Sequence, residues 1–449
     1  MNKLLLLAAA GGLLACGPKP RPYVDAGPDD AGEDAGIDAG RLRGTEPATG
    51  YSRALELPDG VLATVRVGVC ASLALDQFNQ PMIAAIQTDP NNDGKRVDDN
   101  LVFTRWNGVD NKYQVPVTVA PVGEIEIGEP NRQVSLTRDP GTGAIGVAFI
   151  NDQKAVRIAI SNDEGLNWSL ETATLNPASG HLVSNPVLVL DNGVVHLAYF
   201  EAEAQCGAVD CGQVIYRRRV GKAAFSDSLS PVAGSDVTLA KPIAMAVDSD
   251  HKAAVSYFSG VSAPGGTVSL LFWRPDGAVT QKIADSGSAV LTRPVSVSLG
   301  FEGNKPRVAY HLGSSAVPAA QLWYAPATES AGTTFAPVDV PRNTAGATME
   351  GTQSYQSLAF DTAGKVAIAA FHNQSPVQNQ CTGGPKVARA PAGTSTFTVC
   401  RPDPAGTFGF AGEWINVAFH KPGKLTLAFT YETNSNLTIK GGVIVFREP

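Results

Sequence analysis

Seven segments of the chain share one alternation of apolar and polar positions. In each segment an alternating strand runs into an acidic or glycine-containing turn, and a second strand rich in alanine, valine and aromatic residues follows. The turns fall at intervals of 52 to 63 residues, near Asp76, Asp139, Asp191, Asp248, Gly300, Asp361 and His420. Alternation with a period of two around an Asp/Gly turn predicts a β-hairpin. The sequence therefore predicts seven similar hairpins.

Two shorter strands follow most hairpins, such as residues 101–106 and 117–120 after the first. Four strands per repeat are typical of a β-propeller, whose blades bury both faces only when the ring closes. We expect an all-β fold over residues 51–449: a β-propeller of seven four-stranded blades. Six blades with one divergent hairpin, or two stacked sandwiches, are the alternatives. The last repeat shows three strands, so we expect the segment 53–67, with its apolar stretch 63–67, to complete it.

The first residues have the pattern of an export signal. Lys3 gives a positive start, residues 4–14 are largely apolar, and small residues lead to Cys16. The apolar run is shorter than the roughly 20 residues that a membrane-spanning helix needs. The ending Leu13-Leu14-Ala15-Cys16 resembles the lipobox of bacterial lipoproteins, which implies removal of a signal peptide 1–15 and acylation of Cys16. An ordinary secretion signal with a chance cysteine is the alternative.

Residues 16–50 have the composition of a tether. Their Asp-Ala-Gly repeats are acidic and almost free of large apolar side chains. Such a segment cannot bury enough surface to offset its ordering entropy, so we expect a mobile spacer. It resembles the tethers of myxobacterial lipoproteins. Gly17 differs from the aspartate that retains enteric lipoproteins in the inner membrane, and this analogy implies an outer-membrane lipoprotein of the cell envelope.

Composition limits the partners and the redox state. The net charge of −7 disfavours a nucleic-acid partner. An exported protein can form disulfides. We expect Cys206 to pair with Cys211 and Cys381 with Cys400, and Cys70 to take no part in either pair. Spacing alone leaves other connectivities open.

One hairpin carries a recognisable turn motif. The stretch 161–168 matches the Asp-box at four positions, Ser161, Asp163, Gly165 and Trp168. It resembles the Asp-box (BNR) repeats of sialidases and related β-propellers. In such a turn the carboxylate accepts backbone N–H bonds, the glycine takes a positive φ and the tryptophan packs between sheets. Residues 328–335 are a degraded copy with Ser330 in place of the aspartate, and we expect a structural role for both.

An acidic loop in the first repeat resembles a calcium loop of the EF-hand type. Its candidate metal residues are Asp89, Asn91, Asp93, Lys95, Asp98 and Asp99. Oxygen ligands at alternate positions followed by Gly94 fit the needs of Ca²⁺. Asn100 stands where an EF-hand has its bidentate glutamate. A structural Ca²⁺ site is one interpretation, and a solvated hairpin loop without any cofactor is the other.

Alignment of the repeats identifies polar residues just before the innermost strands. These candidates for an axial ligand site are Arg132, Asn185, Lys241, Arg293, Tyr355 and Glu413, with Cys70 in the first repeat. In a propeller these positions surround one mouth of the axial channel. Three cations, a phenol and a carboxylate suit an anionic sugar. They resemble the sialidase inventory, in which arginines bind the substrate carboxylate and a Tyr/Glu pair is catalytic. Polar strand ends lining a wet channel are the simpler interpretation.

Two classes of function remain. The first is a non-catalytic binding or scaffold module on a lipid anchor, which presents its loops to a glycan or protein partner. The long loops 202–213, 260–267 and 373–386 favour it, because insertions on one side of a repeat ring mark contact surfaces. The second is a sialidase-like glycoside hydrolase acting on an anionic sugar. The sialidase Arg-Ile-Pro motif is missing and Lys241 lacks the guanidinium fork, so we assign no catalytic residue.

Overall fold

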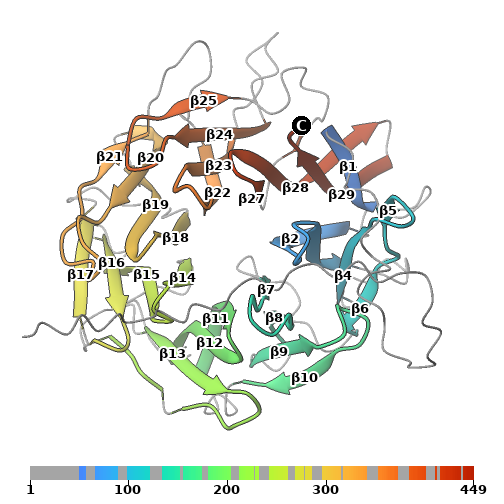
Figure 1. The fold of residues 1–449 in the computed structure, drawn as a ribbon, viewed down its shortest axis with the longest axis horizontal. Helices are drawn as coiled ribbons and strands as arrows, with labels where there is room; N and C mark the ends of the chain where they lie inside the picture. The colour runs from blue at the N-terminus through green and yellow to red at the C-terminus, as the bar shows by residue number, and fades with distance from the viewer. Residues whose placement is uncertain are drawn as a thin grey trace, which may run out of the picture. The chain divides into compact units, whose positions relative to one another are not determined.

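The computed structural model describes eighteen stretches of the chain. They are residues 50–56, 66–88, 99–121, 134–151, 155–173, 181–203, 212–226, 228–231, 242–260, 268–277, 279–285, 296–314, 317–340, 352–372, 384–400, 410–411, 415–435 and 438–449. Their regular elements are all β-strands, arranged as the seven antiparallel blades of a β-propeller (Figure 1). The predicted seven-bladed all-β fold is confirmed. In these stretches no helix is long and apolar enough to cross a membrane.

Each blade runs outward from an innermost strand, and the blades are numbered 1 to 7 in chain order. The innermost strands are β2 (Arg66–Leu75), β7 (Ser135–Arg138), β11 (His181–Asp191), β14 (Ile243–Val247), β18 (Ser296–Glu302), β22 (Thr352–Phe360) and β27 (Asn416–Lys421). The second strands are β3 (Pro81–Thr88), β8 (Ile145–Ile150), β12 (Val194–Glu203), β15 (Ala253–Gly260), β19 (Lys305–Ser314), β23 (Val366–His372) and β28 (Lys424–Ser435).

The outer half of each blade is more varied. The third strands are β4 (Asp99–Asn107), β9 (Val156–Ser161), β13 (Gly212–Val220), β16 (Val268–Arg274), β20 (Val317–Pro326), β24 (Gly384–Ala390) and β29 (Thr438–Arg447). The fourth strands are β6 (Val117–Ala120), β10 (Ser169–Thr172), β17 (Val279–Asp285), β21 (Val338–Asp339), β25 (Thr398–Cys400) and β1 (Gly50–Glu56). In blade 3 an isolated bridge between Tyr216 and Leu229 stands at this position. Two short strands, β5 (Lys112–Tyr113) and β26 (Phe410–Ala411), pair with β4 and β28.

The N-terminal strand completes blade 7. β1 pairs antiparallel with β29, with Gly50 opposite Arg447 and Glu56 opposite Gly442. Closure by the N-terminal segment is therefore confirmed, but the strand is Gly50–Glu56 and not the stretch 63–67. Arg66 instead begins β2, opposite Thr88. The residues Pro58, Asp59 and Gly60 form a turn signal in the sequence between the two strands.

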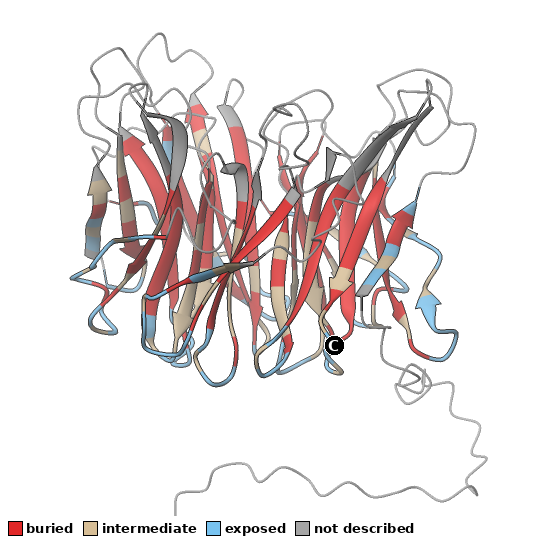
Figure 2. Cartoon of the chain, turned by 90° about the horizontal axis from the view of Figure 1, so that it is seen from above, coloured by how far each residue is buried: buried red, intermediate tan, exposed pale blue. Residues whose placement is uncertain are grey.

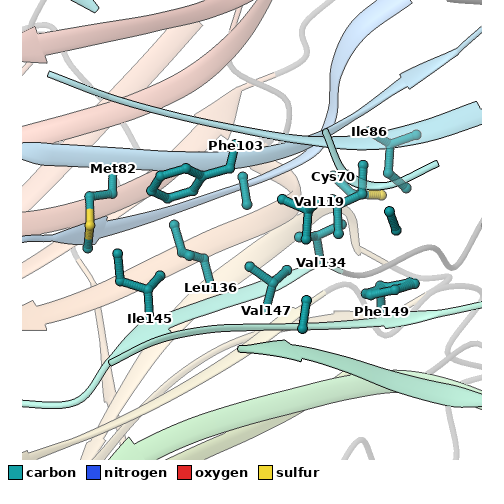
Figure 3. Packing of buried hydrophobic residues seen from close by; sticks show 14 residues of the cluster. Cys70, Met82, Ile86, Phe103, Val119, Val134, Leu136, Ile145, Val147 and Phe149 are labelled. Atoms are coloured by element: carbon teal, nitrogen blue, oxygen red, sulfur yellow. The ribbon is translucent and has the colours of Figure 1, made fainter. Parts of the chain in front are cut away.

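Seven apolar clusters fill the seven seams between neighbouring blades. In the seam between blades 1 and 2, Met82 and Phe103 lie beside Leu136 and Ile145, and all four are buried (Figure 3). The equivalent clusters lie between every other pair, including the seam between blades 7 and 1. Burial of each large apolar side chain stabilises the fold by roughly 1.5–3 kcal/mol. Every blade therefore contributes to two clusters and depends on both of its neighbours for burial of its apolar side chains.

The turn of blade 5 lies two residues beyond the expected position. β18 continues through Gly300 and ends at Glu302, which pairs with Lys305. Glu302 is thus the acidic residue that the fifth repeat lacked in the sequence alignment. Gly300 serves another purpose, because a Cβ atom there would lie 2.8 Å from Phe360 of the next blade. It is a close-packing glycine and not a turn glycine.

The two ends of the ring differ. We call the end that carries the seven innermost hairpin turns the turn face; Figure 2 shows these short exposed turns along one edge of the ring. We call the opposite end the loop face. There the innermost strands begin and the second strands end, so the connections 89–98, 204–211, 261–267 and 373–383 start from it.

Candidate functional site

Three of the innermost strands have a backbone irregularity near the loop face. The ladders of β2, β11 and β22 are interrupted by register shifts at Cys70, Asn185 and Tyr355. The backbone φ is 54° at Cys70 and 52° at Asn185. A left-handed backbone at a residue other than glycine costs roughly 1–3 kcal/mol, and bulges of this kind are enriched beside binding sites.

These three bulged positions belong to the axial set that the sequence indicated. Asn185 is buried, and its side-chain amide donates to Ser184 Oγ at 3.2 Å. Cys70 is also buried and lies close to Ile86, Val119 and Val134 in the seam between blades 1 and 2 (Figure 3). Both side chains therefore pack inside the ring wall. The side chain of Tyr355 and the residues Arg132, Lys241, Arg293 and Glu413 lie outside the described part of the chain.

Strand register divides the axial set into groups. Cys70, Asn185 and Tyr355 stand six residues before the turn residues of their hairpins, whereas Arg132, Lys241 and Glu413 stand seven before theirs. The two groups therefore differ by one position in their distance from the turn. This offset is already present in the sequence, because it is counted from the turn residues.

Blade 5 shows a limit of the alignment. Since its turn acid is Glu302, the residue equivalent to Asn185 is Ser296 and not Arg293. Ser296 is buried, and its Oγ lies 3.0 Å from Nδ1 of His311. Burial lowers the pKa of His311 to about 3, so this imidazole is neutral.

Small polar residues connect the blades around the axis, a feature that the sequence analysis missed. We call the position four residues before each turn residue the axial belt; it holds Ser72, Ser135, Val187, Ala244, Ser298, Ser357 and Asn416. Three serines accept from the next innermost strand: Ser72 from Leu136 N (3.0 Å), Ser135 from Leu188 N (3.0 Å) and Ser357 from Val417 N (3.1 Å). Two residues donate to it: Ser298 to Gln356 O (3.0 Å) and Asn416 to Ala71 O (2.9 Å).

Carboxylates bind the turns to one another at the turn face. Asp139 accepts N–H bonds from its own turn and also from Asn192 (2.9 Å) and Gly193 (2.7 Å) of blade 3. Burial alone would raise the pKa of Asp139, but these hydrogen bonds outweigh it and lower the pKa. Asp361 accepts from Gly423 N of blade 7 at 2.9 Å in the same way.

The turn that contains Ser161 and Trp168 is held by its own side chains. Asp163 Oδ1 accepts from Asn167 N (2.9 Å) and from Ser161 Oγ (2.7 Å). Gly165 has φ 89°, and a Cβ atom there would lie 2.2 Å from Phe103 of blade 1. Trp168 packs edge-on against the same Phe103, with 5.2 Å between the ring centres. The turn therefore closes the outer rim between blades 1 and 2.

The related stretch 328–335 reaches a similar geometry with a different residue. Glu329, one position before Ser330, accepts from Thr334 N (2.8 Å) and Thr333 Oγ1 (2.8 Å). Hydrogen bonds from Thr328 and Thr333 lower the pKa of Glu329 to about 2. Phe335 packs on Phe272 of blade 4. The missing aspartate is replaced by a neighbouring glutamate, which the motif comparison could not reveal.

Arginines on third strands form ion pairs at the turn face. Arg274 contacts Asp248 at 2.6 Å and donates to Ser330 O of blade 5 at 2.8 Å. Arg105 contacts Glu164 of blade 2 at 2.7 Å. Among the residues that the structure describes, the turn-face carboxylates named above thus hold turns and blades together.

The predicted metal and disulfide residues fall almost wholly outside the described stretches. This is the case for Cys16, Asp89, Asn91, Asp93, Lys95, Asp98, Cys206, Cys211 and Cys381, and for the side chains of Asp99 and Cys400. Within those stretches no group of three or more His, Cys, Asp or Glu side chains could hold a metal ion. The Ca²⁺ site and both disulfides stay predictions.

Comparison with known proteins supports the fold and leaves the activity open. No protein-family model matches the chain, and no curated protein is significantly similar to it in sequence. The polysaccharide lyase Uly1 is 12% identical, with 90% of this chain and all of that chain covered and a TM-score of 0.52. An α-L-arabinofuranosidase of Fusarium graminearum (10% identity, coverage 89% and 97%) and a Hadza microbial sialidase (11% identity, coverage 80% and 75%) give TM-scores of 0.46 and 0.43.

At these identities the likeness concerns the fold alone. Solved structures similar to this chain include a sialidase, as the Asp-box resemblance implied.

Proposed function

We propose that this chain is a lipid-anchored protein of the outer membrane whose propeller is a non-catalytic binding or scaffold module, with a glycan or protein partner bound at the loop face. The observation that carries the proposal is the difference between the two ends of the ring. Loops that start from a rigid scaffold are where repeat proteins bind their partners.

The turn face is occupied by internal contacts. Asp139 and Asp361 each bind the backbone of a neighbouring turn, and Arg274 joins Asp248 to the next blade. Groups committed in this way are poorly available to a ligand. A partner at this end would have to displace charge-assisted hydrogen bonds, each of which contributes roughly 1.5–3 kcal/mol.

The loop face offers more to a ligand. The connections 89–98, 204–211, 261–267 and 373–383 begin there, and so do the bulged strand ends at Cys70, Asn185 and Tyr355. The cations Arg132, Lys241 and Arg293 precede innermost strands in the sequence. Cations in that position suit an anionic sugar or another carboxylate.

The point at which the chain enters the ring supports the same assignment. Gly50 begins β1 opposite Arg447, and the N–H of the next residue, Glu448, donates to Leu425 O at the start of β28 at 3.0 Å. The strand β1 therefore begins at the turn face, and the loop face lies at its other end.

The test is binding of the full chain with Cys16→Ser, which cannot be acylated, to a panel of acidic and neutral glycans with and without Ca²⁺. We expect an anionic glycan to bind and Arg132→Ala or Arg293→Ala to weaken it at least tenfold. Lys222→Ala, an exposed cation in blade 3, is the matched control and should leave binding unchanged.

The same panel separates the alternatives. Turnover of a bound glycan would replace the proposal with the sialidase-like hydrolase. Absence of binding across the panel would remove the sugar ligand and leave a protein partner, to be sought at the loop face. Equal loss of binding in the Lys222→Ala control would contradict the assignment of the site.

A further inference from the structure

Lysine ends the innermost turn of four consecutive blades. In each of blades 4 to 7 it stands at the first position of the second strand or immediately before it. The same turn of blade 7 carries a second lysine, directly opposite the first. All of these residues are exposed to solvent: Lys252, Lys305, Lys365, Lys421 and Lys424.

The lysines of blades 6 and 7 lie close together. Lys421 and Lys424 face each other across the end of their hairpin. Lys365 extends from blade 6 to the turn of blade 7, where a Cβ atom added to Gly423 would lie 3.1 Å from the lysine Nζ. Like charges directly opposite each other on a hairpin are destabilising. An anion bound among these ammonium groups would offset the repulsion, because opposite charges attract.

The carboxylates beside these lysines are directed toward internal partners. Glu302 lies 2.6 Å from the guanidinium of Arg307. Asp361 accepts an N–H bond from the turn of blade 7 at 2.9 Å, and Glu448 forms an ion pair with Arg389. These carboxylates stabilise the fold, whereas the lysines extend into solvent. The inner turns of blades 5 to 7 therefore present positive charge, although the chain as a whole has a net charge of −7.

The positive charge is confined to three neighbouring blades. In blade 4, Lys252 is accompanied by exposed Asp250 in the same turn and by exposed Asp276 in the outer turn. Glu329 of blade 5 stands on an outer turn, between the third and fourth strands. The inner turns of blades 5, 6 and 7 follow one another around the ring (Figure 1). We call their lysines the lysine arc: Lys305, Lys365, Lys421 and Lys424.

The shape of the turn face limits the kind of partner. Its hairpin turns are short and lie along one edge of the ring (Figure 2). Packed sheets are roughly 10 Å apart, so the inner turns of blades 5 and 7 are roughly 20 Å apart. A single phosphate or carboxylate group cannot contact lysines over that distance. The head groups of a lipid bilayer can, because they form a broad array of anionic groups.

We propose that the lysine arc is an electrostatic docking surface for an anionic lipid bilayer, in which the ammonium groups donate to head-group phosphates. This goes beyond the proposed function, which concerns a partner at the loop face, and rests on it only for the lipid anchor that brings a membrane within reach. An acyl anchor combined with a basic patch holds a protein on a membrane more firmly than a single acyl chain does. Contacts to the lysines leave the internal hydrogen bonds of the turn face intact.

Sedimentation with lipid vesicles tests the proposal on the full chain with Cys16→Ser, which cannot be acylated. We expect stronger binding to phosphatidylcholine vesicles that contain phosphatidylglycerol than to vesicles without it, and release at high salt, because salt screens exposed charges. The neutral vesicles measure any contribution of the apolar N-terminal stretch. Lys365→Gln combined with Lys424→Gln should weaken binding to the anionic vesicles at least tenfold, because each lysine near such a surface strengthens binding about fivefold.

Lys222→Gln combined with Lys282→Gln is the matched control. It removes the same charge from exposed positions of blades 3 and 4, outside the lysine arc, and should leave vesicle binding unchanged. Circular dichroism checks that both double variants fold. Equal loss of binding in the two double variants would overturn the proposal, because net charge alone would then explain the binding. Equal binding of the parent chain to anionic and neutral vesicles would overturn it too.

One further probe separates a bilayer from a soluble polymer. Binding of an acidic polysaccharide that needs Lys365 and Lys424, without binding to anionic vesicles, would replace the bilayer with a polymer ligand. Glycan binding at the loop face is measured separately through Arg132 and Arg293. The two sets of variants lie on different faces, so a failure of the docking surface and a failure of the proposed function give different results.

Discussion

The same residue type, an aspartate at an innermost turn, has opposite titration behaviour in two blades. Asp76 accepts N–H bonds from Phe78 and Gln80 of its own turn, but burial outweighs them and raises its pKa. For Asp139, burial alone would also raise the pKa, but the hydrogen bonds from its own turn and from the neighbouring turn outweigh burial and lower the pKa. The sequence around the two residues gives no sign of this difference.

This contrast predicts opposite effects of one substitution. Asp139→Asn should lower the free energy of unfolding at pH 7 by ~2 kcal/mol, because an amide cannot accept at both positions. Asp76→Asn should leave it unchanged or raise it by up to ~1 kcal/mol, because an ionised carboxylate is disfavoured there. Urea unfolding of both variants measures the two values.

The pH dependence follows from the direction of each shift. The stabilisation by Asp139 is fully present above its unfolded-state pKa, near 3.9, and is lost as the pH falls through the lowered folded-state pKa. The difference between the parent chain and Asp139→Asn should therefore shrink below about pH 4. A difference that stays constant to lower pH would mean that the carboxylate charge is not what binds the turns.

At the scale of elements, a turn can keep its geometry although its sequence no longer matches the Asp-box motif. In the 328–335 turn, Glu329 makes the contacts that Asp163 makes in the intact motif, although it stands one position earlier in the sequence. Gly332, with φ 69°, matches Gly165, and both approach an aromatic ring of the preceding blade. The geometry depends on one carboxylate within reach of the turn, and its position can move.

We therefore predict that Glu329→Ala lowers the melting temperature and that Ser330→Ala does not. Glu329 loses its bonds to Thr333 and Thr334, whereas Ser330 contributes its backbone carbonyl to Arg274, which alanine retains. Differential scanning calorimetry compares the two variants. A larger effect of Ser330→Ala would show that the motif position, and not the neighbouring glutamate, stabilises the turn.

The whole molecule depends on one strand that is distant in sequence from its partners. Ala54 and Leu55 of β1 are buried with Ile83 and Val102 of blade 1 and with Val443 of blade 7. Without β1, the backbone groups along the edge of β29 and the apolar side chains Ile83 and Val102 of blade 1 would be exposed to solvent. Exposed strand edges of this kind also promote aggregation.

Deletion of residues 50–56 should accordingly abolish cooperative unfolding and give aggregates in light scattering. Deletion of residues 17–45, which precede β1, is the control and should leave the melting temperature within about 2 °C of the parent chain. A soluble, cooperative protein without β1 would show that six complete blades and one partial blade suffice.

Much of this architecture follows from the sequence alone. The alternation of apolar and polar residues determines the hairpins, because each blade face must be apolar to pack against its neighbour. The regular spacing determines the number of blades, and the missing strand of the last repeat predicts closure by the N-terminus. These properties depend on local periodicity and on burial, which a linear pattern records.

Other properties were decided by the tertiary structure. The identity of the strand that closes the ring and the turn at Glu302 depend on strand register. The replacement of the motif aspartate by Glu329 depends on which carboxylate reaches the backbone of the turn. The axial belt depends on contacts between residues more than 50 positions apart. Hydrogen bonds across a seam are set by how two blades meet in space, so no pattern within one repeat could determine them.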